Sequence, residues 1–557
     1  MERPNTILLV DNEAHVRKST GRLLETKGYR IFTAATADVA RRILDQERIS
    51  LAIIDIRLMD DDDPNDVSGL DLAAGLDPHV AKIILTGFRT EEHIRRALIG
   101  YLNQVAPAQD VIRKQDGPAA LLQAIERVFV NQIYAAINFS LNIRFDKAIT
   151  LDKLILPLDA SPVDHEEVEE LFRRLFRREE EIKIYYMPPG SGGSSVMLVR
   201  PTYKGMDGLP LVVKFGPAER IHREVSAYQN YVEPFVHRRS TVMIGQPVRT
   251  QRLAACKLLF VGQSLNRPQD FNSYYRDPTV ASEALQKTIR DVFSQSCGMW
   301  YSGKCDWRDE DGALVRAMEK QLSVDIASDR SELESSLENL LDGKAFHHVA
   351  FTRINQSRIR IKINGEEQEL PDPLFFVTRH QDRLPTPGFA AITHGDLNGR
   401  NMFVDETGST WLIDFFRTGW GPASRDAAEL ESAIKFELLQ STNLAALLEF
   451  ERAILSPSTF AEEVVLPQRS AGKEFQRALN GLQAVREAAW KINETAGMDE
   501  YYALLLFYAL KLMTWKGLSS IDRRRQPLRL RHSLYSAALL SAKFMSAGKS
   551  PEVRHIL

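Results

Sequence analysis

Two groups of residues in this 557-residue chain have the types and spacing that phosphate chemistry needs. In the first group, Asp11, Asp55 and Thr86 each stand at the end of a short apolar run, and Lys114 follows a weaker run. Crowded carboxylates repel one another unless a divalent cation neutralises them, and oxygen ligands suit magnesium. A carboxylate beside such a metal can attack a phosphoryl group, while a hydroxyl and an ammonium group hold the phosphoryl oxygens. The first group therefore predicts a pocket that forms an aspartyl phosphate.

The second group begins with a lysine and a glycine-rich turn. Lys214 lies near the end of the apolar run L-V-V-K-F and needs a partner, which Glu224 in the next helical stretch can supply. Such a pair positions the α and β phosphates of ATP. Upstream, P-P-G-S-G-G-S-S lies between two expected strands, and its glycines let backbone amides approach phosphate closely. The residues of this turn that we expect at the nucleotide are Gly190, Ser191, Gly192 and Gly193.

Two further segments complete the second group. In T-H-G-D-L-N-G-R-N, Asp396 stands five residues before Asn401, so the aspartate can act as a base towards a hydroxyl while the asparagine binds a metal. In W-L-I-D-F-F, Asp414 ends an expected strand and can bind magnesium between the phosphates. We expect His394 to support the loop rather than to take a proton. Because phosphoryl transfer is catalysed mostly by positioning and charge neutralisation, these groups predict an ATP- and Mg²⁺-dependent phosphotransferase.

The residues of the first group can act together only if a sheet places the ends of their strands at one edge. Short apolar runs alternate with helical periods over about the first 130 residues, which is the pattern of a parallel sheet wrapped by helices. Ligands bind beyond the carboxyl ends of such strands. The expected strands are residues 6–10, 30–34, 51–55, 81–86 and 111–113. The expected helices include residues 15–27 and 36–46, and helical spacing from 118 to about 143 predicts a last helix that runs into a linker.

The pattern changes further along the chain. A second helical run spans residues 165–181, and a β-rich region begins at residue 182. Residues 307–382 fit neither flank, and alternation at 358–363 and 373–377 predicts a small β insertion. From Asp426 onward the pattern is helical.

The first group resembles the receiver domain of response regulators, over roughly residues 3–130. The resemblance implies a flavodoxin-like doubly wound domain in which Asp55 is the phosphoacceptor, Asp11 and Asp55 bind Mg²⁺, Thr86 is the switch hydroxyl and Lys114 binds phosphate. It also implies a sensor histidine kinase or a phosphotransfer protein as the partner. The family usually has two adjacent acids after the first strand, whereas Asp11 is followed here by Asn12, a neutral ligand.

The second group resembles the aminoglycoside phosphotransferase and choline kinase group, over roughly residues 182–550. The resemblance rests on H-G-D-L-N-G-R-N followed by I-D-F-F, and on G-P-A-S-R-D-A-A-E-L, where an aspartate after Gly-Pro starts the helical C-lobe. It implies a bilobal α+β kinase-like fold with Asp396 as the catalytic base and Asn401 and Asp414 as metal ligands. Lys214 and Glu224 would form the phosphate clamp. The acceptor would be a hydroxyl group on an unidentified small molecule or protein.

Together these patterns predict an α/β multidomain chain. Its expected parts are a receiver domain at 1–130, a helical linker at 131–181, a kinase-like N-lobe at 182–275, hinge helices with an inserted small β module at 276–390, and a catalytic helical C-lobe at 391–557.

Composition narrows the function further. A net charge of −3 and the lack of a recognisable DNA-binding motif argue against a nucleic-acid partner. The longest apolar stretch near the end contains Lys511 and falls short of a membrane span, and the start does not read as a signal peptide. Three cysteines without a C-x-x-C pair fit a reducing, cytoplasmic location.

Three hypotheses follow from the sequence. The first is a signalling enzyme in which phosphorylation of Asp55 alters the activity of an ATP-dependent phosphotransferase. The second is a phosphorylation-dependent adaptor whose kinase-like domain binds nucleotide without catalysis. The third, a DNA-binding regulator, is the least supported because no helix-turn-helix pattern is present.

Overall fold

The computed structural model describes residues 3–60, 62–63, 65–87, 91–99, 106–146, 164–186, 194–236, 242–259, 269–308, 314–322, 330–405, 408–494, 497–514 and 525–546. The chain divides into two compact units, Met1–His222 with Met243–Leu259 and Arg223–Val242 with Phe260–Leu557. Within the described parts, no helix is long and apolar enough to cross a membrane.

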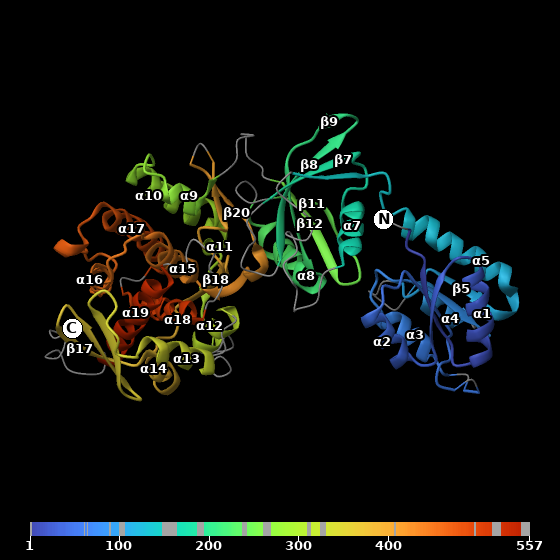
Figure 1. The fold of residues 1–557 in the computed structure, drawn as a ribbon, viewed down its shortest axis with the longest axis horizontal. Helices are drawn as coiled ribbons and strands as arrows, with labels where there is room; N and C mark the ends of the chain where they lie inside the picture. The colour runs from blue at the N-terminus through green and yellow to red at the C-terminus, as the bar shows by residue number, and fades with distance from the viewer. Residues whose placement is uncertain are drawn as a thin grey trace. The chain divides into compact units, whose positions relative to one another are not determined.

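A parallel five-stranded sheet forms the N-terminal domain, with strand order β2-β1-β3-β4-β5 (blue in Figure 1). Its strands are β1 (Thr6–Val10), β2 (Arg30–Ala34), β3 (Leu51–Ile54), β4 (Ala81–Thr86) and β5 (Asp110–Arg113). Its helices are α1 (Ala14–Thr26), α2 (Ala37–Gln46), α3 (Ser68–Gly75), α4 (Glu91–Ile99) and α5 (Gly117–Val128). The predicted flavodoxin-like fold of this part is confirmed, with small shifts at the ends of the predicted elements.

Helices cover both faces of this sheet. On β1, Leu8 and Val10 enter one core with residues of α2, α3 and α4, whereas Ile7 and Leu9 enter a second core with residues of α1 and α5. Successive residues of a strand point to opposite faces. Because both faces are buried, the strands read as continuous apolar runs in the sequence.

The last helix of this domain leads directly into the next sheet. Helix α5 continues as the π-helix η2 (Phe129–Tyr134), whose Tyr134 hydroxyl donates to the carbonyl of Pro4 at 3.0 Å. After a turn, strand β6 (Asn142–Phe145) pairs in parallel with β7 (Glu181–Tyr186). This strand lies inside the predicted helical linker, and it forms because pairing with β7 satisfies its backbone groups.

Helix α7 (His165–Leu175) is also shorter than the predicted helical run over 165–181. It ends at Phe176, whose backbone leaves the helical region and whose ring is buried in the core of the second sheet. The second sheet has the order β11-β12-β10-β8-β7-β6, and β9 (Met206–Asp207) pairs with β8 off this path. Its other strands are β8 (Ser195–Tyr203), β10 (Leu211–Pro217), β11 (Val242–Arg249) and β12 (Leu253–Leu259).

The second unit combines three small sheets with a helical lobe. The sheets have the orders β13-β19-β20, β14-β18-β21 and β15-β16-β17. Their strands are β13 (Gln269–Asp270), β14 (Cys305–Asp306), β15 (Val349–Asn355), β16 (Arg358–Ile363), β17 (Glu366–Pro371), β18 (Phe389–Thr393), β19 (Met402–Val404), β20 (Thr410–Leu412) and β21 (Gly419–Pro422). The helices are α9 (Phe271–Arg276), α10 (Ser282–Asp291), α11 (Gly298–Ser302), α12 (Leu314–Leu322), α13 (Arg330–Leu340), α14 (Pro373–Arg379), α15 (Arg425–Ala433), α16 (Leu444–Ile454), α17 (Lys473–Asn493), α18 (Asp499–Thr514) and α19 (Gln526–Ser546).

One part of the predicted β insertion is wrong. Residues 358–363 do form a strand, β16, but residues 373–377 belong to helix α14. The carboxylate of Asp372 accepts hydrogen bonds from the backbone N–H groups of Leu374 at 2.9 Å and Phe375 at 3.1 Å. An aspartate N-cap followed by proline at the first helical position starts a helix whatever the pattern that follows.

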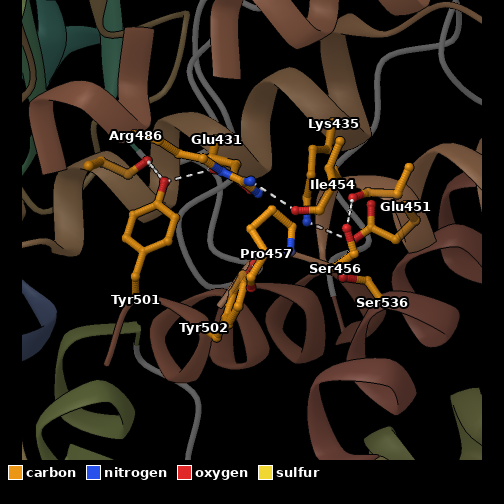
Figure 2. A network of polar contacts seen from close by, with 12 residues as sticks. Glu431, Lys435, Glu451, Ile454, Ser456, Pro457, Arg486, Tyr501, Tyr502 and Ser536 are labelled. Atoms are coloured by element: carbon orange, nitrogen blue, oxygen red, sulfur yellow. Dashed lines mark hydrogen bonds and ion pairs between the residues drawn. The ribbon is translucent and has the colours of Figure 1, made fainter. Parts of the chain in front are cut away.

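Buried ion pairs hold the helical lobe together (Figure 2). Glu431 on α15 accepts two hydrogen bonds from Arg486 on α17 and a third from the hydroxyl of Tyr501 on α18. Nearby, Lys435 donates to Glu451 of α16 at 2.7 Å, and both side chains are fully buried. Buried charges cost free energy unless they are paired and hydrogen-bonded, so these contacts fix how the helices pack.

Glu451 is the most highly connected carboxylate of this network. Besides Lys435, it accepts from the Ser536 hydroxyl at 2.5 Å and lies 2.9 Å from Nε2 of His532, both on α19. Burial alone would raise the pKa of Glu451, but Lys435 and His532 outweigh it and lower the pKa to about 2. The stabilising effect of this carboxylate is therefore present above its usual pKa of 4.5 and is lost as pH falls towards 2.

We expect Lys435→Met to destabilise the second unit by about 3–5 kcal/mol, because it leaves the Glu451 charge buried without its main partner. All six tryptophans of the chain lie at or beyond residue 300, so tryptophan fluorescence during urea unfolding measures this unit alone. As a control, Arg469→Ala removes an exposed ion pair with Glu449 and is expected to cost no more than about 1 kcal/mol. Equal effects of the two variants would contradict the assigned role of Lys435.

Candidate functional site

The register of the parallel sheet places Asp11 beside Asp55. Val10 is paired with Ile54, so the residues that follow β1 and β3 emerge next to each other. Thr86 is paired with Arg113, which puts the threonine at the end of β4 next to the start of Lys114. Asp11, Asp55 and Thr86 are all buried. The predicted residues of the first group therefore meet at the carboxyl edge of the sheet.

Lys114 lies at the centre of this acidic pocket. Its Nζ atom is 2.5 Å from Asp55 Oδ2, 2.8 Å from Asp11 Oδ2 and 3.1 Å from Glu13 Oε1. Burial disfavours the charge on Lys114, but hydrogen bonds to Asp11 and Asp55 outweigh it and raise its pKa. The ammonium group thus neutralises carboxylates that would otherwise repel one another.

Asp55 keeps an unusual pKa in spite of this partner. Burial raises the pKa of Asp55, Lys114 and the backbone N–H of Ile56 lower it, and the nearby charge of Asp11 raises it; the net result is a pKa of about 6. The buried carboxylate is therefore held in its charged form at neutral pH at a cost in stability, which a divalent cation can relieve.

The donor set of this pocket fits a hard divalent cation. One carboxylate oxygen from each of Asp11, Glu13 and Asp55 lies within 4.8 Å of the others. Oxygen ligands of this kind bind Mg²⁺. Glu13 was not among the predicted ligands, although an acid two residues after Asp11 is a visible signal. It stands in for the second acid that Asn12 does not supply.

Gly69 closes the loop that follows Asp55. Its backbone N–H donates to the carbonyl of Ile56 at 2.8 Å. A Cβ atom at this position would lie 1.7 Å from the carbonyl oxygen of Asp55, so only glycine allows α3 to begin so close to the pocket.

In the second unit, the loop between β18 and β19 brings Asp396 and Asn401 into contact. The side-chain amide of Asn401 donates to the backbone carbonyl of Asp396 at 2.8 Å and to its carboxylate at 2.9 Å. Because both hydrogen bonds use the amide nitrogen, the amide oxygen of Asn401 is left as the atom that can bind a cation. The backbone N–H of Ile413 donates to the carbonyl of Asn401 at 3.0 Å, which brings the neighbouring Asp414 to the same place.

Two features of the segment around Asp414 are unusual. Asp414 has a left-handed backbone, with φ 65° and ψ 73°. Such conformations are costly for a residue other than glycine and cluster at functional sites. Beside it, Nε2 of the buried His394 lies 3.0 Å from the carbonyl of Ile413. A carbonyl only accepts, so Nε2 carries the proton, and burial lowers the pKa of His394, which keeps the ring neutral. His394 thus ties the loop to the segment of Asp414.

The start of α15 holds the loop in place. The buried carboxylate of Asp426 accepts hydrogen bonds from the backbone N–H groups of His394 at 2.7 Å and Gly395 at 2.8 Å, and from the Tyr301 hydroxyl at 2.8 Å. Arg425 donates to the carbonyl of Gly395 at 2.6 Å. Gly395 has φ +78°, and a Cβ atom there would lie 2.3 Å from the carbonyl of Arg417. The sequence marked Asp426 only as the start of the helical lobe.

The remaining predicted residues are divided between the two units or lie outside the described residues. Lys214 is buried in β10, between β8 and β12, in the first unit. Glu224 is buried on α8 (Ala218–Ala227) and belongs to the second unit. Their pairing therefore stays a prediction. The predicted nucleotide-binding residues Gly190, Ser191, Gly192 and Gly193 lie outside the described residues.

The N-terminal fold and pocket define a flavodoxin-like α/β domain with a cation-binding acidic edge. Residues 7–126 match the family model of the response regulator receiver domain. Residues 356–514 match the model of ternary complex associated domain 9. Among curated proteins, no sequence matches the chain.

Solved structures similar to this chain are receiver domains. A CheY-like receiver domain protein from Methanospirillum hungatei is 30% identical and covers 23% of this chain and 97% of its own, with a TM-score of 0.21. The receiver domain of a putative LuxO repressor from Vibrio parahaemolyticus is 20% identical and covers 23% and 92%, with a TM-score of 0.20. A response regulator from Burkholderia pseudomallei, solved with a phosphorylated aspartic acid and a calcium ion, is 23% identical and covers 24% and 71%, with a TM-score of 0.19.

The N-terminal domain is therefore a response regulator receiver domain. The family match, the parallel sheet and the acidic pocket agree on this point. No family model or solved structure described above supports the kinase-like resemblance of the rest of the chain, which therefore rests on the sequence motifs and on the contacts of their residues.

We expect Asp55→Asn to stabilise the receiver domain at neutral pH without metal, by roughly 1–3 kcal/mol. Because the folded-state pKa of Asp55 is raised from 3.8 to about 6, the folded protein binds more protons than the unfolded chain between these values, and stability rises as pH falls through that range. The gain should therefore shrink towards pH 4. Calorimetry of the full chain measures it, with millimolar Mg²⁺ as a control that removes most of the difference. A lower unfolding temperature for Asp55→Asn at neutral pH would contradict this reading of the pocket.

Proposed function

We propose that this chain is a two-component response regulator in which a phosphoryl group on Asp55 controls an ATP- and Mg²⁺-dependent phosphotransferase of the aminoglycoside phosphotransferase and choline kinase type. The observation that carries the proposal is the paired contact of Asn401 with Asp396, beside the strained Asp414. A loop held in this way offers a base and two oxygen ligands in one place.

In the receiver domain, the phosphoryl donor is a histidine kinase or a phosphotransfer protein. An oxygen of Asp55 forms a bond to phosphorus while the phosphorus–nitrogen bond of the donor's phosphohistidine breaks, and the imidazole leaves. Asp11, Glu13 and Asp55 would hold Mg²⁺, which neutralises the charge that gathers on the phosphoryl oxygens. Lys114 then exchanges its carboxylate partners for a phosphoryl oxygen, and Thr86 supplies a hydroxyl at the next strand end.

In the second unit, Asp396 would accept the proton of an acceptor hydroxyl. The hydroxyl oxygen bonds to the γ-phosphorus of ATP while the bridging bond to the β-phosphate breaks, and ADP leaves. Asn401 and Asp414 would hold Mg²⁺ at the phosphates, and Lys214 with Glu224 would position the α and β phosphates. The acceptor is a hydroxyl on a small molecule or a protein, and a cytoplasmic location stays a prediction of the sequence.

A second candidate is an adaptor that assembles in a phosphorylation-dependent complex without catalysis. The description of the family model matched by residues 356–514, a ternary complex associated domain, favours this candidate. The two candidates differ in whether ATP is turned over.

Acetyl phosphate with Mg²⁺ should add one phosphoryl group to the chain, and Asp55→Ala should abolish this addition, because it removes the proposed phosphoacceptor, the carboxylate that lies nearest to Lys114. Intact-mass measurement checks the result. Chelation of Mg²⁺ should also abolish it. The matched control is Asp62→Ala, an exposed acid in the loop after Asp55, which should keep the label. Label that survives Asp55→Ala would break the phosphoacceptor assignment.

Labelled ATP should lose its γ-phosphate to water or to one of a panel of hydroxyl compounds when Mg²⁺ is present. Asp396→Ala and Asp414→Ala should each lower the rate by about 10²-fold or more, because each removes a group that acts on the transferred phosphate or the attacking hydroxyl. The control is Asp382→Ala, an exposed acid at the end of the insertion, which should leave the rate unchanged. If neither phosphorylated nor unphosphorylated protein binds or turns over ATP, the adaptor is the better account.

A further inference from the structure

A buried glutamate lies directly behind the loop of Asp396. Glu429 is on α15, one helical turn after Arg425, and it is almost fully buried. Its Oε2 atom accepts a hydrogen bond from the backbone N–H of Leu397 at 3.0 Å. Leu397 is the residue that follows Asp396, so this bond fixes the peptide that carries the proposed base.

The same oxygen joins the loop to helix α18. The Tyr508 hydroxyl donates to Glu429 Oε2 at 3.2 Å, and Lys511 Nζ lies 3.8 Å from Oε1. Burial, followed by the nearness of Glu429, raises the pKa of Tyr508, so the hydroxyl remains a donor. Glu429 is therefore the one described carboxylate that contacts both the loop after Asp396 and α18.

Charged groups from three elements act on Glu429. Lys511 of α18 and Arg425 of its own helix favour the charged form, whereas Asp396 of the loop and Asp426 of its own helix disfavour it. Burial is the largest effect and raises the pKa of Glu429, and the balance of all these effects leaves that pKa at about 7. The carboxyl group thus changes its charge near neutral pH while it is bonded to the loop.

We propose that Glu429 is a positioning residue for Asp396, which holds the Leu397 peptide firmly when it is charged and loosely when it is neutral. The proposal deepens the phosphotransferase function proposed above and rests on it for the role of Asp396. A carboxylate makes a stronger hydrogen bond to a backbone N–H than a neutral carboxyl group does.

Two carboxylates of α15 hold the backbone on either side of Asp396. Asp426 holds the N–H groups of His394 and Gly395, before Asp396, and Glu429 holds the N–H of Leu397, after it. The base therefore sits on a loop that is fixed on both sides by one helix. The bond after Asp396 depends on Glu429, whose pKa is raised to about 7.

Hydrogen exchange of the full chain tests the proposal without requiring any activity. In the wild type, the amides of residues 394–401 should exchange roughly tenfold more slowly at about pH 8 than at about pH 6, after correction for intrinsic rates, since a charge-assisted bond is about twice as strong as a neutral one. In Glu429→Gln, which keeps an acceptor for Leu397 but no charge, the change should fall below about twofold. At about pH 6 the two proteins should agree.

A second variant separates this role from simple packing. Tyr508→Phe removes a donor to the carboxylate, so the midpoint of the pH change should move upward while the change itself persists. Two results would overturn the proposal. One is the same pH dependence of amide exchange at residues 394–401 in the wild type and in Glu429→Gln. The other is faster exchange throughout the second unit of Glu429→Gln at every pH. If the wild type turns over no ATP while the pH-dependent protection of the loop persists, the phosphotransferase function fails and the hold of Glu429 on the loop stands.

Discussion

The second unit depends on a loop with no regular structure whose backbone N–H groups are buried. A buried N–H without a partner costs free energy. The loop around Asp396 avoids this cost because carboxylates of α15 accept hydrogen bonds from its N–H groups. Asp426 accepts two consecutive N–H groups and a tyrosine hydroxyl. The helix that provides these acceptors is itself fixed by Glu431, and its π-helical continuation η8 (Ile434–Leu438) is fixed by Lys435; their partners lie on α16, α17 and α18. The geometry of the candidate site therefore depends on how the helices of this lobe pack.

The two acidic centres solve the same electrostatic problem in different ways. In the receiver domain, the carboxylates gather around one ammonium group, whose positive charge offsets their mutual repulsion. In the second unit, the carboxylates are kept apart by separate backbone and amide donors. The first arrangement is suited to receiving a charged group, and the second to keeping ligands in fixed positions.

Much of the receiver domain could be predicted from the sequence because its strands are buried on both faces and their ends carry the reactive residues. Position in a parallel sheet then brings Asp11, Asp55, Thr86 and Lys114 together without further information. Glu13 escaped prediction because its role depends on how the turn after β1 folds. Residues 373–377 alternate like a strand but form a helix, because Asp372 caps the backbone N–H groups of its first turn and Pro373 occupies its first position. Asp426 and Glu429 act through bonds to distant backbone atoms, which no local pattern encodes.

The path from α5 to β6 has a consequence for how the receiver domain can communicate. Ile133 of η2 belongs to the core of the receiver domain, whereas Leu141, a few residues later, belongs to the core of the next sheet. Between them, Arg173 of α7 donates to the carbonyls of Asn138, Phe139 and Leu141. The segment that links the two cores is therefore held by hydrogen bonds to α7. It continues into β6, an edge strand of the second sheet, so a change in η2 would act on that strand through a hydrogen-bonded segment.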